Sequence, residues 1–304
     1  MKTSTKIIGI ISLLFISSLF IFSSKKDDVT LTNEKNTSET YQIKALKIPT
    51  NLNFAGERVP TEDEDVKERI DRELLVNTYW QSNTILLIKR ANKYFPIIEP
   101  ILKKNGIPDD VKYIALIESG LQNVTSPAGA RGFWQIMKAT AQENGLEVND
   151  NVDERYHVEK STEVACNYLN KAYKKFGNWT LAAASYNAGM SGISKKQEEQ
   201  LVSNYYDLLL TEETKRYILR IVAIKEIVSN PEKYGYIYDQ DDLYNLPPTK
   251  TIKVDSTITN LAKFSKDLGI NYKIIKEHNP WLRENKLNNT SKKEYQIKIP
   301  NNTK

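Results

Sequence analysis

The sequence predicts a mainly helical protein that ends in a small mixed module of strands and helices. Apolar residues such as Ile70 and Leu74 recur at three-to-four spacing over much of residues 62–229, which is the period of a helix with one buried face. No stretch before residue 250 alternates convincingly between apolar and polar side chains, as a half-buried strand would. Alternating segments first appear after Pro247 and Pro248, so this proline pair divides the two parts.

Short breaks of glycine, proline or asparagine separate the predicted helices. Gly106 and Pro108 mark one such break, and Gly177 and Asn178 mark another. Glycine permits the left-handed conformation in which many helices end, and proline lacks the amide hydrogen that a helix interior uses. The predicted helices cover residues 62–93, 95–105, 109–120, 137–144, 159–176, 179–189 and 212–229.

Residues 250–301 predict a βααβ module, joined to the helical part by a linker over 241–249. "KTIKV" predicts a strand, "TITNLAKFSKDLG" and "YKIIKEHN" predict two helices, and "EYQIKIP" predicts a closing strand. The 12 cations and 5 acids of residues 250–304 give a net charge of +7, against +5 for the whole chain. The module is therefore expected to face an anionic polymer or surface, or else to present only a solvated basic face.

Composition narrows the classes of chemistry. The 304 residues are 40% hydrophobic, which is enough to bury a core. Cys166 is the single cysteine, and His157 and His278 are the only histidines, so neither a metal site nor a Ser-His-Asp triad is well supported. No phosphate-binding glycine pattern occurs. We expect no cofactor, no metal and no nucleotide. The 17 tyrosines and 4 tryptophans suit sugar rings, or core packing alone.

The first residues are typical of an export signal. Lys2 and Lys6 precede an apolar stretch over 7–22, as in a basic region followed by a hydrophobic region. No A-x-A site follows, so residues 1–24 are read as a signal peptide or as an uncleaved N-terminal anchor. The absence of a nearby cysteine excludes a lipoprotein signal. Residues 25–50 are polar and aperiodic and predict a disordered tether. Export to the cell envelope argues against nucleic acid as a partner, although the basic charge alone would permit it.

Glu118 is the most informative single residue. It lies in "ALIESGLQNVTSPAGARGFWQIM", and on a helix that begins near Pro108 it shares one face with the apolar Val111, Ile114 and Ala115. Burial raises a carboxyl pKa, and the negative end of the helix dipole acts in the same direction. A carboxyl that keeps its proton near neutral pH can serve as a general acid. The alternative is a buried structural glutamate paired with an arginine or lysine.

The residues after Glu118 predict a cleft. Gly129 and Gly132 allow close backbone approach, and Gln135 offers an uncharged hydrogen-bonding group beside two aromatic rings. Further along, "AAASYNAGMSGI" places Tyr186 and Asn187 where a helix could end. This combination suits a polar, neutral, ring-shaped ligand.

These motifs together resemble those of a known family. "ES", "SPAGARGFWQIM", "TAQENGL", "ASYNAG" and "ETKRYI" are similar in order and spacing to lysozyme-like lytic transglycosylases of the SLT type. The resemblance extends over about 51–240, with its core at about 95–230. It implies a mainly α, lysozyme-like (SLT or goose-type) helical catalytic domain that acts on peptidoglycan glycan strands at the cell envelope surface or in the periplasm.

The resemblance also implies roles for individual residues. Glu118 would be the single catalytic acid and base, and Glu213 with Tyr217 would orient the surrounding groups. Met137 could instead be a core residue, and Glu213 could instead cap its own helix. The residues implied in substrate binding are Ser119, Ser126, Gln135, Met137, Tyr186, Asn187, Glu213 and Tyr217.

The implied reaction cleaves the bond between N-acetylmuramic acid and N-acetylglucosamine. One carboxyl protonates the glycosidic oxygen, the 2-acetamido group stabilises the sugar cation, and the C6 hydroxyl then closes on C1 to give a 1,6-anhydro end. Asp153 and Glu154 remain candidates for a second acid. The alternatives are a goose-type lysozyme-like hydrolase of the same bond and a catalytically silent peptidoglycan-binding protein.

The C-terminal module resembles a LysM domain, a family that binds glycans containing N-acetylglucosamine. The βααβ order and the segments "LAKFSKDLG", "EHNPWL" and "YQIKIP" carry this resemblance. The stretch Asp255-Ser256-Thr257 stands where LysM modules usually carry Gly-Asp-Thr after the first strand. This departure bears on glycan affinity rather than on the fold.

Overall fold

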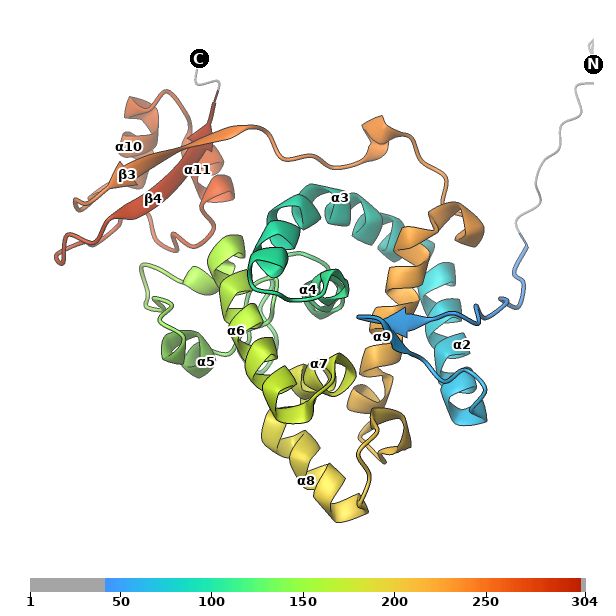
Figure 1. Cartoon of the computed structure of the whole chain (residues 1–304). Coiled ribbons are helices and arrows are strands. Elements are labelled where there is room, and N and C mark those ends of the chain that lie inside the picture. Colours follow the sequence, from blue (N-terminus) through green and yellow to red (C-terminus); the bar gives the residue numbers. More distant parts are fainter. Residues whose placement is uncertain (1–41, 302–304) are drawn as a thin grey trace, which may run out of the picture. The chain divides into compact units, whose positions relative to one another are not determined.

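The computed structural model describes residues 42–301 (Figure 1). The predicted signal peptide or anchor over 1–24 lies outside the described residues, and so does most of the predicted tether over 25–50. From Ala45 onward the chain forms one compact unit. None of the helices within 42–301 has both the length and the apolar character needed to cross a bilayer.

Helices dominate the described chain, with two short antiparallel sheets. The α-helices are α2 (Glu64–Tyr79), α3 (Gln81–Lys104), α4 (Lys112–Ser119), α5 (Lys138–Glu143), α6 (Val158–Phe176), α7 (Trp179–Ala188), α8 (Met190–Gln200), α9 (Glu212–Ser229), α10 (Leu261–Asp267) and α11 (Tyr272–His278). The strands are β1 (Asn53–Phe54), β2 (Glu57–Arg58), β3 (Thr249–Val254) and β4 (Tyr295–Pro300). Single 3-10 turns are η1 (Asp109–Val111), η2 (Glu154–Tyr156), η3 (Tyr205–Asp207), η4 (Pro231–Tyr234) and η5 (Gln240–Asp242).

Five predicted helices are confirmed: 109–120 as η1 with α4, 137–144 as α5, 159–176 as α6, 179–189 as α7 and 212–229 as α9. Helix α8 and the β1–β2 hairpin are not predicted by the sequence patterns. Helix α8 buries only Ile193, so its sequence carries almost no apolar period. The hairpin has two residues per strand, paired as Asn53 with Arg58 and Phe54 with Glu57, which is too short for an alternating pattern.

The predicted break between helices near residue 94 is wrong, because the chain breaks at Trp80 instead. The Tyr236 hydroxyl donates to the backbone carbonyls of Asn77 (3.0 Å) and Thr78 (2.6 Å) at this junction. A side chain distant in sequence therefore holds the last turn of α2, and no local pattern in 62–93 reports it.

Helix α3 continues through Pro96 and Pro100, where the sequence analysis placed a new helix start. Each proline removes one hydrogen bond to the carbonyl four residues earlier. Tertiary packing of the buried side chains of α3 outweighs this loss. The buried side chains on this part of α3 are Ala91, Phe95, Ile98 and Leu102.

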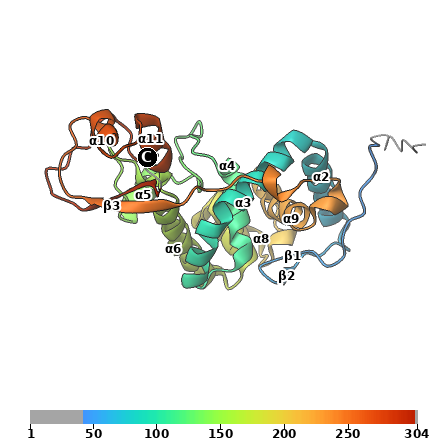
Figure 2. The same cartoon turned by 90° about the horizontal axis from the view of Figure 1, so that it is seen from above.

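Helix α4 is the centre of the helical part. Figure 1 shows it surrounded by α3, α6, α7 and α9, and Ile114, Ala115 and Leu116 on it are almost completely buried. Figure 2 shows α2 and α9 packed side by side. Across that contact the buried carboxylate of Glu73 on α2 accepts a hydrogen bond from Arg216 on α9 (2.7 Å). The short helix α4 is therefore enclosed by longer helices, two of which are joined by this buried contact.

The C-terminal module has the predicted βααβ order, with β3 and β4 antiparallel and Ile252 opposite Ile297. Its apolar core also includes Val152 and Tyr156, which belong to the helical part. The backbone amide of Asp153 donates to the carbonyl of Trp281 (2.9 Å). The module therefore packs on the helical part through shared apolar side chains as well as through polar contacts.

Candidate active site

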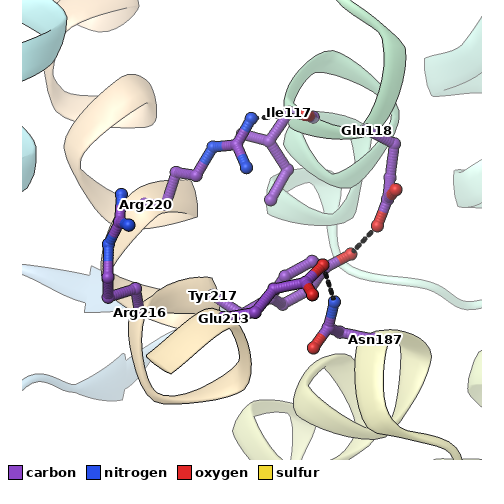
Figure 3. A pocket seen from close by; sticks show the side chains of 7 residues that line it. All are labelled: Ile117, Glu118, Asn187, Glu213, Arg216, Tyr217 and Arg220. Carbon is purple, nitrogen blue, oxygen red and sulfur yellow. Dashed lines mark hydrogen bonds between the residues drawn. The ribbon is translucent and has the colours of Figure 1, made fainter. Parts of the chain in front are cut away.

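The Glu118 carboxyl lies in a pocket of about 210 Å³ formed by α4, α7 and α9 (Figure 3). The residues that line it are Ile117, Glu118, Asn187, Glu213, Arg216, Tyr217 and Arg220. Four predicted site residues, Glu118, Asn187, Glu213 and Tyr217, are thus brought together from three segments that are distant in sequence.

The end of α4 places Glu118 at the pocket. Gly120 adopts a left-handed conformation (φ 60°) directly after the last helical residue, a common way for a helix to end. A β-carbon at this position would lie 3.1 Å from Nη1 of Arg90 and 3.2 Å from a methyl group of Leu87. The buried Ser119 hydroxyl donates to the Phe133 carbonyl (2.8 Å). Ser119 therefore fixes the helix end to the following loop and does not contact the carboxyl of Glu118.

Burial raises the pKa of Glu118, and the nearby charge of Glu213 raises it further. The hydrogen bond from Tyr217 and the charge of Arg220 lower this pKa, but burial prevails. The Arg220 guanidinium donates to the Ile117 carbonyl (2.8 Å) rather than pairing with Glu118. The predicted direction of the pKa shift is confirmed, and the geometry is not that of a structural ion pair.

Two tyrosines flank the carboxyl in different ways. The Tyr217 hydroxyl donates to Oε1 of Glu118 at 2.6 Å, and its side chain is only 4% exposed. The Tyr186 hydroxyl donates to the backbone carbonyl of Trp134 at 2.8 Å. Burial and the charge of Glu118 raise the pKa of both phenols well above their ordinary value. Both hydroxyls therefore stay protonated and act as donors.

Asn187 and Glu213 join the end of α7 to the start of α9. The Asn187 amide donates to Oε1 of Glu213 (3.0 Å) and accepts from the Thr214 hydroxyl (2.8 Å). The N-cap of α9 is Thr211, and the Glu213 carboxylate accepts its hydrogen bond from α7. Glu213 is a second carboxylate in the pocket that holds Glu118.

Five predicted substrate-binding residues do not line the pocket of Glu118: Ser119, Ser126, Gln135, Met137 and Tyr186. The Ser126 hydroxyl accepts from the Ala130 amide (3.0 Å), and the Gln135 side chain donates to the Gly132 carbonyl (2.7 Å). Both shape the loop itself. Met137 is 45% exposed just before α5, so the alternative interpretation of it as a core residue is wrong.

Asp153 and Glu154, the candidates for a second acid, lie elsewhere. Asp153 is buried and pairs with Arg155 (2.8 Å) and Arg131 (3.0 Å), and these hydrogen-bonded cations lower its pKa. Glu154 pairs with Lys160, which lowers its pKa in the same way. Arg155 also donates to the carbonyls of Gly129 (3.1 Å) and Ile136 (3.3 Å). The pair Asp153–Arg155 therefore holds the glycine-rich loop in shape.

Two further pocket residues, Arg216 and Arg220, were not among the predicted site residues. Both line the pocket, and together with Glu213 and Tyr217 they recur on α9 at positions i, i+3, i+4 and i+7. Residues at these positions share one helical face. This spacing within "ETKRYILR" is the signal that could have found them.

A second pocket, of about 370 Å³, adjoins the first. Ile117, Glu118, Arg216 and Arg220 line both. Helices α2 and α3 form the far wall of the second pocket. Within residues 42–301, no group of three or more histidine, cysteine, aspartate or glutamate side chains is arranged to hold a metal ion.

Two stretches of the chain match models of known protein families. Residues 95–207 match the family model of the transglycosylase SLT domain, and residues 250–303 match that of the soluble lytic transglycosylase C-terminal LysM-like domain. The predicted resemblance is confirmed, and so is the fold class of a mainly α, lysozyme-like domain followed by a small LysM-like one.

Among curated proteins the chain is similar to membrane-bound lytic murein transglycosylase D of Escherichia coli K12, with 31% identity over 180 residues. That match covers 57% of this chain and 39% of the relative, so the chain spans about two fifths of the relative's length. A putative tributyltin chloride resistance protein of an Alteromonas strain is 31% identical over 102 residues, 33% of this chain and 49% of that protein.

Among solved structures, the chain is similar to the 70 kDa soluble lytic transglycosylase Slt70 of Escherichia coli. The match covers 59% of this chain and 31% of the chain of Slt70. The sequence identity is 18% and the TM-score is 0.43.

Proposed function

We propose that this protein is a peptidoglycan lytic transglycosylase. It cleaves the β-1,4 bond between N-acetylmuramic acid and N-acetylglucosamine and leaves 1,6-anhydro ends. The observation that carries the proposal is the Glu118 carboxyl, whose pKa is raised by burial and which is oriented by Tyr217 in an open pocket of an SLT domain. The name of the relative, a lytic murein transglycosylase, supports the same reaction.

The mechanism follows from the chemistry of one carboxyl. Protonated Glu118 gives its proton to the glycosidic oxygen as the bond from that oxygen to C1 of the muramoyl residue breaks. The 2-acetamido oxygen of the same residue stabilises the positive charge at C1. The Glu118 carboxylate then takes the proton of the C6 hydroxyl while O6 bonds to C1. The proton returns to Glu118, and no water is consumed.

Tyr217 supports the intermediate state of this cycle. When Glu118 has lost its proton, the Tyr217 hydroxyl is already placed to donate to the carboxylate. A hydrogen bond to a charged acceptor is stronger than one to a neutral group. Tyr217 therefore stabilises the carboxylate form between the two proton transfers, while burial keeps that form basic enough to accept the second proton.

The other site residues bind substrate in this proposal. Asn187 and Glu213, held together across α7 and α9, present hydrogen-bonding groups to the sugar. Tyr186, whose hydroxyl is held by the Trp134 carbonyl and whose phenol feels the charge of Glu118, is assigned a place beside the acid. Four residues are assigned to the glycan that extends beyond the pocket: Ser119 at the end of α4, and Ser126, Gln135 and Met137 after it.

We assign the chain to the bacterial cell envelope, with peptidoglycan strands as its partner. The supporting features are the predicted export signal at 1–24, the murein named in the relative and the LysM-like domain. In this assignment residues 51–240 form the catalytic domain, 241–249 the linker and 250–301 the wall-binding domain. The basic charge of the last domain attracts it to an anionic wall.

Digestion of purified peptidoglycan, followed by mass spectrometry of the soluble products, tests the reaction. We expect muropeptides that end in 1,6-anhydro-N-acetylmuramic acid, and Glu118→Gln should form them at least about 100-fold more slowly. Products with reducing ends would instead show hydrolysis. The absence of any product from the unaltered protein, while it still sediments with peptidoglycan, would identify a silent wall-binding protein.

Hydrolysis is the second candidate because Glu213 shares the pocket with Glu118. A second carboxylate could activate a water molecule on the opposite face of the sugar, as in inverting glycosidases. The variant Glu213→Gln separates the two reactions. A transglycosylase should keep forming anhydro ends at a reduced rate, because the C6 hydroxyl is activated by Glu118. A hydrolase that depends on Glu213 would lose its reducing-end products.

A further inference from the structure

Trp80 has an unusual position for a large apolar side chain. It is 60% exposed, whereas Trp134 and Trp281 are 0% and 4% exposed, and Trp179 is half-buried. It lies at the junction of α2 and α3, on the wall of the pocket of about 370 Å³ that also contains Glu118. Its indole therefore contributes little to the core and faces the cleft of the candidate active site.

The junction that carries Trp80 is rigid. The Trp80 amide donates to the Val76 carbonyl (3.0 Å), and the Trp80 carbonyl accepts from the Thr84 amide (3.1 Å). The Tyr236 hydroxyl binds the carbonyls of the two residues that end α2 just before this point, Asn77 and Thr78. An exposed indole on a fixed backbone loses little conformational entropy when a ligand covers it.

The pocket around Trp80 suits a neutral polar ring. Val76 and Val124, 41% and 40% exposed, add apolar surface. Three amide side chains line the same pocket, those of Asn77, Asn83 and Gln122. Pyranose rings have an apolar face of C–H groups and an equatorial rim of hydroxyl and acetamido groups. The apolar face fits an indole, and amides pair with the rim.

The acidic residue on this wall, Glu73, is already paired with two arginines. Glu73 is buried and accepts hydrogen bonds from Arg72 (2.6 Å) and Arg216 (2.7 Å). It is therefore not free to bind a cation or to act as a base. Apart from Glu73, Glu118 and the buried Ser119, the polar side chains that line this pocket are amides and arginines, which fits a sugar better than a cationic ligand.

We propose that Trp80 is a stacking platform for an N-acetylated hexosamine ring of the glycan strand, in a subsite that adjoins the bond cleaved at Glu118. This inference rests on the proposed function and extends it, since it defines how far the substrate must reach. The wall lies on α2 and on the first part of α3, before the match to the SLT domain begins at residue 95. The helices that precede the catalytic core thus complete the substrate cleft.

Binding to the Glu118→Gln protein tests the platform without turnover. Calorimetry with a peptide-free tetrasaccharide of alternating N-acetylglucosamine and N-acetylmuramic acid should give an affinity that falls about tenfold in Trp80→Ala, since loss of an aromatic anchor at a binding site costs more than 1 kcal/mol. The control Tyr244→Ala removes an aromatic ring of similar exposure (42%) outside both pockets. It should leave the affinity unchanged.

Chemical modification gives a second measurement that does not need a Trp80 variant. In Glu118→Gln, N-bromosuccinimide should oxidise Trp80 first because it is the most exposed tryptophan, and the tetrasaccharide should protect it, as peptide mapping will show. If Trp80→Ala binds the tetrasaccharide as well as its parent, or if Trp80 oxidises at the same rate with saturating tetrasaccharide, the platform is excluded. Neither result would bear on the anhydro products of the unaltered protein, so the reaction and the platform can fail separately.

Discussion

At the scale of single residues, the site depends on a conflict around Glu118. Burial favours the neutral carboxyl, while the bond from Tyr217 and the charge of Arg220 favour the carboxylate. A group held between these tendencies can give and take a proton in one catalytic cycle. The same conflict costs stability, because burial disfavours the ionised form of the carboxyl.

Glu118→Gln should therefore remove activity and add stability at neutral pH. The pKa of Glu118 is raised in the folded protein, so its stabilising contribution is complete below the unfolded-state pKa of about 4.3 and is lost as pH rises through the folded-state value. Glutamine has no such loss. Melting temperatures should be measured from pH 4 to pH 8. The melting temperature of Glu118→Gln should exceed that of the unaltered protein by an amount that grows as the pH rises.

Activity of Glu118→Gln should fall about 10²–10⁴-fold or more, the usual contribution of a general acid and base. The matched control is Glu213→Gln, which changes an exposed carboxylate of the same pocket and should show little divergence in melting temperature. A Glu118→Gln protein that melts below the unaltered one at pH 7 would contradict the account of the carboxyl.

Tyr217→Phe should shift the pH profile rather than merely slow the enzyme. The lost hydrogen bond is one that lowers the pKa of Glu118, so this pKa should rise further and the alkaline limb of kcat against pH should move to higher pH. Loss of a hydrogen bond to a charged group costs about 1.5–3 kcal/mol, which is roughly a 10- to 100-fold fall in kcat at the optimum. An alkaline limb that stays in place would exclude this role for Tyr217.

Tyr186→Phe is the control for that measurement. The Tyr186 hydroxyl donates to a backbone carbonyl and not to Glu118. Its loss should slow turnover with a smaller displacement of the alkaline limb than in Tyr217→Phe.

At the scale of elements, the loop over 126–137 is shaped by a buried ion pair that supports it from behind. Arg155 binds two loop carbonyls and is itself held by Asp153. Gly132 packs against the backbone of Arg155 so closely that a β-carbon would lie 2.1 Å from the carbonyl oxygen. The loop thus depends on one position where no side chain fits.

Gly132→Ala should destabilise the protein far more than Gly129→Ala. Both glycines have positive φ, 77° and 87°, so alanine costs about 1–2 kcal/mol of backbone strain at either position. A β-carbon at Gly129 meets no atom within 4 Å. The clash at Gly132 should add at least about 1–3 kcal/mol, visible as a lower midpoint of urea unfolding. Equal midpoints for the two variants would show that the loop can move away from Arg155.

Sequence patterns could predict α4, α6, α7 and α9 because each buries a periodic apolar face or ends at a glycine or asparagine. They could place Glu118 on its helical face for the same reason. They could not place the break at Trp80, since the contact that fixes it comes from Tyr236. They also could not separate Gln135, which bonds within its loop, from Asn187, which lines the pocket, because both are amides in glycine-rich surroundings.

At the scale of the whole molecule, the LysM-like domain is packed against the catalytic part. Val152 is completely buried within the core of that domain, and Tyr156 lies under the guanidinium of Arg283, 4.2 Å from the ring centroid. Asn151 donates to the Glu284 carboxylate (2.9 Å). The segment that contributes these contacts also contains Asp153, which supports the glycine-rich loop. The LysM-like domain and the glycine-rich loop therefore share one structural segment.

This shared segment predicts that the two domains unfold together. Leu282 is completely buried in the C-terminal core and forms a β-bridge with Val152. Leu282→Ala should cost about 2–5 kcal/mol, and in scanning calorimetry a single transition should move to lower temperature as a whole. Lys253→Ala is the control, because its ion pair with Glu294 is exposed and such pairs contribute about 1 kcal/mol or less. Its transition should stay within a few degrees. If Leu282→Ala instead produced a separate early transition while the main one kept its temperature, the LysM-like domain would be an independent module, and its packing on residues 151–156 would not stabilise the active-site loop.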